Sequence, residues 1–167
     1  MRRTIALGLS VALTLAGAAT ARGEEDLVGL GPVRAYSLSD VEWKEGPFPG
    51  SKVAVLAGDP KTGMHHAYLE LSDSARIAPH WHSTDEYATV VSGTVLFAVG
   101  EDFEPAKGRQ FGPGAFIFVP ARTPHYAWTE GGAVLSQTRS GAQDIHWVHA
   151  EEAPAPGPGA LPPAKNK

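Results

Sequence analysis

The sequence predicts an all-β domain, built as a sandwich or a barrel, and three observations predict it. Short runs of β-branched and aromatic residues alternate with turn residues from about residue 52 to residue 148, as in folds made of many short strands. No stretch of the mature chain keeps a helical period over three turns. The 167-residue chain contains no cysteine, so one domain must fold on its core alone, and any metal must be held by imidazole and oxygen ligands.

Residues 1–21 have the features of a secretory signal peptide. The basic pair Arg2-Arg3 precedes an apolar run that begins at Ile5, and residues 19–21 offer small side chains for cleavage. A membrane anchor is the less favoured alternative, because the run is shorter than the ~20 residues of a spanning helix. Cleavage removes two of the 14 Lys+Arg and none of the 18 Asp+Glu, so the formal charge falls from −4 to −6. We therefore expect a periplasmic or secreted protein that binds neither nucleic acid nor, after cleavage, a membrane.

Three further segments are expected after the signal peptide. Residues 22–50 are polar and Gly/Pro-rich, with Trp43 and Phe48 as anchors, and form an N-terminal arm that lies over the domain. Residues 51–150 form the β domain. Residues 151–167 contain five prolines and are expected to be disordered, because such a segment makes neither a strand ladder nor a helix.

The strands are predicted from alternation with a period of two residues. In the run 65–71, for example, Ala67, Leu69 and Leu71 share one face and Tyr68 lies on the other. Turn residues separate the runs, and a polar loop is expected over residues 101–112. The expected strands are 52–57, 65–71, 86–91, 94–99, 115–119, 125–129, 134–138 and 144–148.

Four residues form a candidate metal site. His80 and His82 are two apart, so in a strand both imidazoles point to the same face. Glu86 has the same parity at the start of the next run, and His125 begins a later strand that could complete the site from across a barrel. The alternative, surface histidines on an exposed strand, is disfavoured because three polar groups aimed into an apolar interior need a partner.

Two segments of the chain resemble the motifs of the cupin superfamily. The first cupin motif is His-x-His, three residues, Glu, six residues and Gly, and it is matched here by His80, His82, Glu86 and Gly93. The second opens with Gly, five residues and Pro, followed later by His, and it is matched by Gly114, Pro120 and His125. Glycines that this family usually carries are replaced here by Ser74 and Arg122, and a frequent Asn by Thr129.

The resemblance spans about residues 53–149 and implies a double-stranded β-helix, or jelly-roll, barrel. It also implies that His80, His82, Glu86 and His125 face the interior as metal ligands, and that the protein forms a homodimer. The replaced positions are backbone or shape positions and none is a ligand, so the metal site stays intact.

Other residues are weaker candidates for the site. His65 and His66 are neighbours on a strand, so only one of them can face a pocket, and a structural role is favoured for both. Tyr68 is a candidate substrate-binding residue, with packing as the alternative. Gln137, a second substrate-binding candidate, alternates with Arg139, and both could orient an oxygen-rich substrate if their strand face is inward.

Three function classes remain open for a site of three His and one Glu. The set suits one divalent ion, Fe, Mn, Ni, Cu, Co or Zn, and leaves open positions for a small-molecule substrate. The first hypothesis is an oxygenase acting on a small enol, phenol or diketone, with Glu86 as the catalytic base. The second is a non-redox lyase, isomerase or decarboxylase, and the third is a metal or small-ligand binding protein without turnover.

Overall fold

A computed structural model describes residues 33–154 of the chain. The chain divides into two units, Met1–Tyr36 and Ser37–Lys167, and every helix and strand below belongs to the second. No helix among the described residues has the length and apolar character needed to cross a membrane. The strands are β1 (Lys44–Glu45), β2 (Ser51–Gly58), β3 (His65–Leu71), β4 (Arg76–Trp81), β5 (Glu86–Gly93), β6 (Val95–Val99), β7 (Arg109–Phe111), β8 (Phe116–Val119), β9 (His125–Trp128), β10 (Ala133–Arg139) and β11 (His146–Trp147), with 3₁₀ turns at η1 (Pro105–Lys107) and η2 (Ala150–Glu152).

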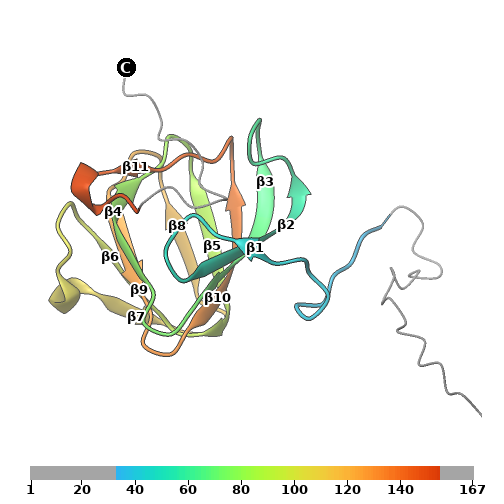
Figure 1. The fold of residues 1–167 in the computed structure, drawn as a ribbon, viewed down its shortest axis with the longest axis horizontal. Helices are drawn as coiled ribbons and strands as arrows, with labels where there is room; N and C mark the ends of the chain where they lie inside the picture. Colours follow the sequence, from blue (N-terminus) through green and yellow to red (C-terminus); the bar gives the residue numbers. More distant parts are fainter. Residues whose placement is uncertain (1–32, 155–167) are drawn as a thin grey trace, which may run out of the picture. The chain divides into compact units, whose positions relative to one another are not determined.

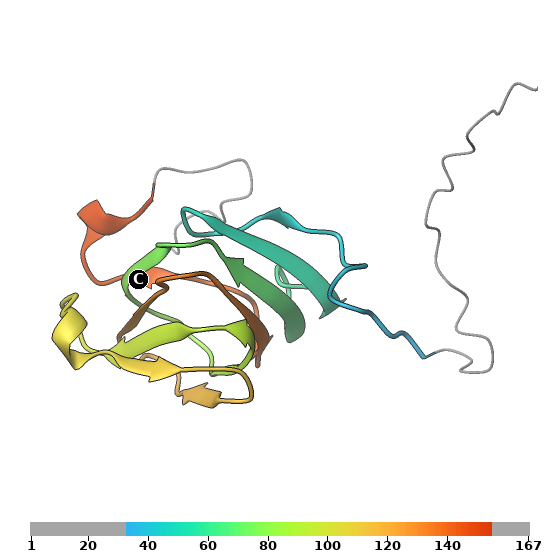
Figure 2. The ribbon, with the colours of Figure 1, turned by 90° about the horizontal axis from the view of Figure 1, so that it is seen from below.

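The described strands form two antiparallel sheets, and the all-β prediction is confirmed. One sheet has the order β1-β2-β3-β10-β5-β8 and the other β11-β4-β9-β6-β7. Both sheets also join strands from distant parts of the sequence, as in the pairing of β3 with β10. Figures 1 and 2 show the strands curving around a common interior, which is the jelly-roll barrel that the motifs imply.

The register of the ladders brings the candidate site residues together. In the five-stranded sheet His80 of β4 pairs with His125 of β9, which lies 45 positions later in the sequence. In the six-stranded sheet Glu86 of β5 pairs with Arg139 of β10. Cross-strand partners project from the same face of a sheet, so each pair sends two functional side chains toward the same side.

The core fills the space between the sheets. Its buried residues come from both sheets, for example Leu69 and Val90 from one and Ile77 and Val95 from the other. The alternation in β3 is as predicted, because Ala67, Leu69 and Leu71 are buried and the residues between them are only half-buried. Burial of these side chains stabilises the fold by roughly 25 cal/mol per Å² of apolar surface.

The ends of the domain extend beyond the expected boundaries. Within the predicted arm, β1 pairs with β2 and Phe48 is part of the buried core, so the folded region begins before residue 51. At the other end, η2 is ordered and Glu152 Oε1 lies 3.1 Å from a guanidinium nitrogen of Arg76. The predicted signal peptide, 1–21, and the tail from residue 155 onward lie outside the described residues.

Two positions where cupins usually have glycine adopt left-handed backbone conformations. Ser74 has φ of 60° and Arg122 has φ of 62°, and no other non-glycine residue in the described range has a positive φ. A side chain makes this conformation costly, by about 1–2 kcal/mol. The turns of the fold are therefore kept although the glycines are not.

Candidate metal centre

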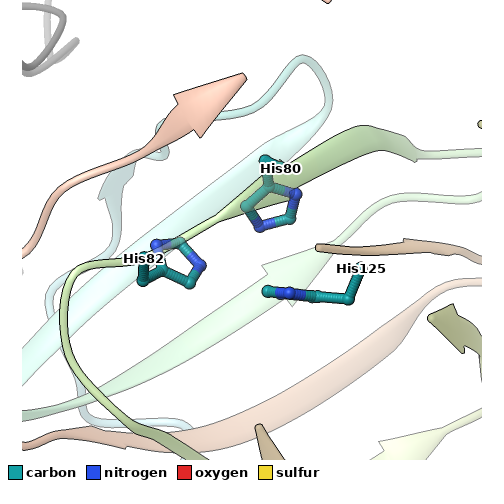
Figure 3. A group of neighbouring side chains, drawn as sticks. All are labelled: His80, His82 and His125. Atoms are coloured by element: carbon teal, nitrogen blue, oxygen red, sulfur yellow. The ribbon is translucent and has the colours of Figure 1, made fainter. Parts of the chain in front are cut away.

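Three histidines converge inside the barrel. His80 lies in β4, His82 follows the end of that strand and His125 opens β9. One ring nitrogen from each lies within 4.8 Å of the others, and all three residues are 3% exposed. Figure 3 shows the three rings turned toward one another from the two neighbouring strands. The structure thus brings together three of the four residues that the sequence predicts as metal ligands.

The Nδ1 atom of each ring is held by a backbone carbonyl. His80 Nδ1 lies 2.8 Å from the oxygen of Ala78, and His125 Nδ1 lies 2.9 Å from the oxygen of Thr123. The backbone carbonyl of Asp144 contacts Nδ1 of His82 in the same way. Because a carbonyl only accepts, each Nδ1 must carry the hydrogen, and each Nε2 presents a lone pair. His82 Nε2 is buried and has no hydrogen-bond partner within residues 33–154, as expected of an atom that binds a metal.

Burial keeps the three imidazoles neutral. It is the largest cause that lowers the pKa of His80, His82 and His125, and for the first two the pKa falls well below the usual value. The nearby Arg139 guanidinium lowers the pKa further in all three rings. Neutral imidazole is the form that binds a metal, so no proton has to be displaced from these rings at neutral pH.

Glu86 lies beside the histidines and is shared with other groups. Its Oε2 is 3.4 Å from Nε2 of His82 and 3.7 Å from Nε2 of His125. The Nε2 of Gln137 donates a hydrogen bond to the other carboxylate oxygen at 2.6 Å. A guanidinium nitrogen of Arg139 lies 3.0 Å from Oε2. Glu86 is therefore placed for ligation, but its carboxylate already has a cation as neighbour.

Arg139, which sequence reasoning placed in the site only if its strand face is inward, is buried beside Glu86. It is 5% exposed, and its Nη1 is buried with no hydrogen-bond partner in the described part of the chain. Its alternation with Gln137 on one strand is the signal that points to a shared face, and both residues line the cavity described next. A buried guanidinium stays charged, so the centre contains an ion pair before any metal is bound.

A small cavity adjoins the histidines. It leaves about 30 Å³ for the centres of water-sized molecules, enough for a metal ion with one or two small ligands. Its polar walls are His80, His125, Glu86, Gln137 and Arg139, and the remaining walls are apolar: Phe48, Leu69, Ile77, Ala88, Val95, Phe97, Ile117, Ala127 and Leu135. The apolar lining lowers the local dielectric constant, which strengthens the interactions of every charge in the site.

The other predicted site residues lie elsewhere. Tyr68 is on the face of β3 opposite Leu69, and its ring is 6.5 Å from that of Trp43, so it does not line the cavity. His66 is on the same outer face, with Nδ1 2.7 Å from the hydroxyl of Thr138. His65 points inward but contacts the carbonyl of Gly63. The prediction that these two histidines face opposite sides is confirmed.

A segment after β10 fixes the position of His82. The Asp144 carbonyl accepts from His82 Nδ1, and the Asp144 carboxylate accepts from the backbone nitrogen of Ser83 at 2.9 Å. His146 stacks on Trp81 with ring centroids 3.8 Å apart and an interplanar angle of 5°. These contacts bridge about 60 positions of sequence, so no local pattern could have predicted them.

The donor set fits a divalent transition metal. Three neutral imidazoles with free Nε2 atoms and a nearby carboxylate match the ligand preferences of Mn, Fe, Co, Ni, Cu and Zn. The three histidines would hold the ion, and the Glu86 carboxylate would complete or flank the set.

Comparisons with known proteins agree with this architecture. Residues 67–136 match a family model described as a cupin domain, and no curated protein sequence matches the chain. Similar solved structures include an RmlC-like cupin from Shewanella frigidimarina (20% identity, TM-score 0.54, 66% of this chain and 93% of that one). They also include the polyketide cyclase RemF from Streptomyces resistomycificus (20% identity, TM-score 0.58, 73% of this chain and 89% of that one). A third is the oxalate decarboxylase of Bacillus subtilis (15% identity, TM-score 0.51, 67% of this chain and 31% of that one).

These likenesses are below 25% identity and therefore show the fold. The family match covers β5, β8 and β9 and includes the three histidines, Glu86, and both motifs. The family match and the two motifs together identify residues 67–136 as a cupin domain, and the jelly-roll architecture agrees with it.

Proposed function

We propose that this chain is a metal-dependent cupin oxygenase that acts on a small enol, phenol or diketone. One observation carries the proposal. Three buried imidazoles, each fixed through Nδ1, present Nε2 lone pairs to a common point beside a carboxylate, in a cavity whose other walls are mainly apolar. A divalent metal bound there would polarise a chelating oxygen substrate and, if it is redox-active, would allow that substrate to react with O₂.

The chain's own residues would orient the substrate and move a proton. Glu86 Oε2 faces the Nε2 side of His82 and His125, where a substrate hydroxyl would lie. Among the described residues it is the only carboxylate that lines the cavity, so it is the group placed to take that proton. Gln137 and Arg139 hold the carboxylate in one orientation by contacts of 2.6 and 3.0 Å. The apolar walls exclude bulk water from the reacting group.

A non-redox reaction on a carboxylate-bearing substrate is the second candidate, and Arg139 favours it. The Nη1 atom of this residue is buried, and no group of residues 33–154 forms a hydrogen bond with it. A metal with two positive charges added beside the Glu86–Arg139 pair would leave an excess of positive charge in a buried site. An anionic substrate would balance that excess, as in a lyase or decarboxylase reaction.

Metal analysis followed by an oxygen-uptake screen separates the two candidates. The full-length protein is purified from the compartment where it folds, its metals are measured by mass spectrometry, and O₂ consumption is followed with a panel of enols, phenols and diketones. Under the oxygenase proposal, the protein is expected to contain iron, copper, nickel, cobalt or manganese and to consume O₂. The Glu86→Gln variant should lose O₂ consumption while keeping its metal. Tight zinc without uptake on any compound would exclude the oxygenase proposal.

Export to the periplasm is part of the proposal and rests on residues 1–21. Their basic start, apolar run and small residues at 19–21 support cleavage after Ala21. N-terminal sequencing of the mature protein is expected to begin at Arg22, and an intact Met1 would contradict the proposal. The homodimer also stays a prediction, which the molar mass measured by light scattering would test.

A further inference from the structure

The metal cavity is too small for the body of the proposed substrate. It offers about 30 Å³, whereas a cavity that binds benzene measures roughly 150 Å³. An enol or phenol could place its reacting oxygen in the cavity, but its carbon skeleton has to lie elsewhere. The inference below rests on the proposed function, because it asks where that skeleton binds.

A second, larger hollow shares walls with the metal cavity. It offers about 260 Å³ and lies along β6, η1, β7 and β8. Phe97 and Ile117 line both spaces, so these two side chains form the partition between them. Phe97 also packs against the metal-ligand ring of His125, with ring centroids 5.5 Å apart. The hollow is therefore adjacent to the metal centre, with a wall of two side chains between.

Strand register places the part of the hollow that β6 and β7 form on the inner face of the barrel. Phe97 pairs with Arg109 and Val95 pairs with Phe111, so these four side chains project from one face of the sheet. Val95 is buried in the core, so this face is the inner one. Yet Val99, which has the same parity in β6, is 60% exposed. β7 and β8 are each the last strand of their sheet, so no further strand of residues 33–154 covers this side.

The chemistry of the hollow suits an apolar carboxylate. Phe111, Phe116 and Val99 supply apolar wall, and Arg109 and Lys107 supply positive charge. Lys107 already contacts Glu104, whereas no carboxylate among residues 33–154 forms an ion pair with Arg109. The Arg109 guanidinium carbon lies 5.7 Å from the Phe111 ring centroid, so charge and apolar surface are presented side by side.

We propose that this hollow binds the body of a small aromatic or aliphatic carboxylate, with Arg109 pairing its carboxylate and Phe97 and Ile117 admitting its reacting end to the metal. Arg109 would then determine substrate specificity without touching the metal. The occupant is a monoanionic small molecule, because the apolar wall excludes a strongly hydrated ligand. Within residues 33–154, Arg109 is the one cation of the lining without an ion-pair partner.

Ligand binding to the metal-free protein tests the proposal separately from the proposed function. Benzoate is titrated into the full-length chain, with benzamide as a neutral probe of the same shape, and binding is followed by changes in amide chemical shifts. Benzoate is expected to shift residues of β6, β7 and β8. Arg109→Gln is expected to weaken benzoate about fivefold, as for a solvent-exposed ion pair, and to leave benzamide unchanged. Lys52→Gln is the matched control, because Lys52 pairs with Glu70 in the other sheet, and it should change neither affinity.

The outcomes are distinct. Equal affinities for benzoate and benzamide, no effect of Arg109→Gln, or shifts confined to other strands would each overturn the proposal, even if metal binding is normal. No binding of either probe, together with dimerisation that buries Phe116, would show instead that a second copy covers the hollow. Conversely, benzoate binding that depends on Arg109 in a protein that takes up no metal would support the hollow and contradict the proposed function.

Discussion

Replacing Arg139 by methionine tests how the buried ion pair and the metal share Glu86. Glu86 is 6% exposed in the parent structure. In the metal-free protein the substitution removes the cation beside its carboxylate, and Gln137 stays as the one hydrogen-bond donor among the described residues. Removing one partner of a buried pair costs about 3–5 kcal/mol. For a domain of this size that cost corresponds to a fall in Tm of about 6–20 °C.

Bound metal is expected to reverse most of this loss. With zinc present, Glu86 gains a new cation, and the repulsion between Arg139 and the ion is gone. We therefore expect Arg139→Met to bind zinc at least about tenfold more tightly than the parent protein, or about 1.4 kcal/mol. The same added zinc should then raise its Tm more than it raises that of the parent.

Thermal unfolding and zinc calorimetry on four proteins measure both effects. They are the parent, Arg139→Met, Glu86→Gln and the double variant, with and without zinc. In the absence of metal the double variant should be more stable than the sum of the single losses implies, because neither charge is left alone. The reasoning is refuted if Arg139→Met costs less than about 1 kcal/mol, or if zinc stabilises the parent and the variant equally.

Two further predictions concern pH and backbone strain. The lowered pKa values of His80, His82 and His125 mean that the unfolded chain takes up protons near pH 6.5 while the folded chain does not. The free energy of unfolding should therefore fall as pH drops below about 6.5, by about 1.4 kcal/mol per pH unit for each ring that stays neutral. Circular-dichroism melts of the metal-free protein from pH 7.5 to 5.5 measure this fall. A constant Tm over that range would contradict the prediction. Arg122→Gly should raise the free energy of unfolding by roughly 0.5–1 kcal/mol because φ is 62° there. Lys61→Gly, at a turn residue without positive φ, should lower the free energy of unfolding. Urea unfolding of both variants measures the two changes, and equal changes would contradict the strain argument.

Sequence reasoning predicted the fold wherever local alternation decides which face is buried. The strand 65–71 and the start of the strand at Glu86 coincide with β3 and β5. His80 and His82 are two residues apart, so their rings share one face. That face is the inner one, because His80 pairs with His125 of β9. The jelly-roll order itself followed from the motif resemblance, since alternation does not encode which strands are neighbours.

The remaining features depend on contacts between distant residues. The Glu86–Arg139 pair spans 53 positions and results from the β5–β10 register, which no local pattern shows. Tyr68 has the parity expected of its strand, but that parity faces outward, against Trp43. Phe48 joined the core because β1 pairs with β2, a short ladder whose composition resembles a loop.

Metal binding by the three histidines tests the central claim most directly. Zinc or cobalt is titrated calorimetrically into the metal-free full-length protein and into its variants His80→Ala, His82→Ala and His125→Ala. His66→Ala is the control, because the His66 ring contacts Thr138 and Ser136 outside the site. One equivalent should bind the parent and the control, and each of the three variants should lose more than about 100-fold in affinity, since no thiolate can substitute. Unchanged binding in those three variants would contradict the assignment of this barrel as a metal centre.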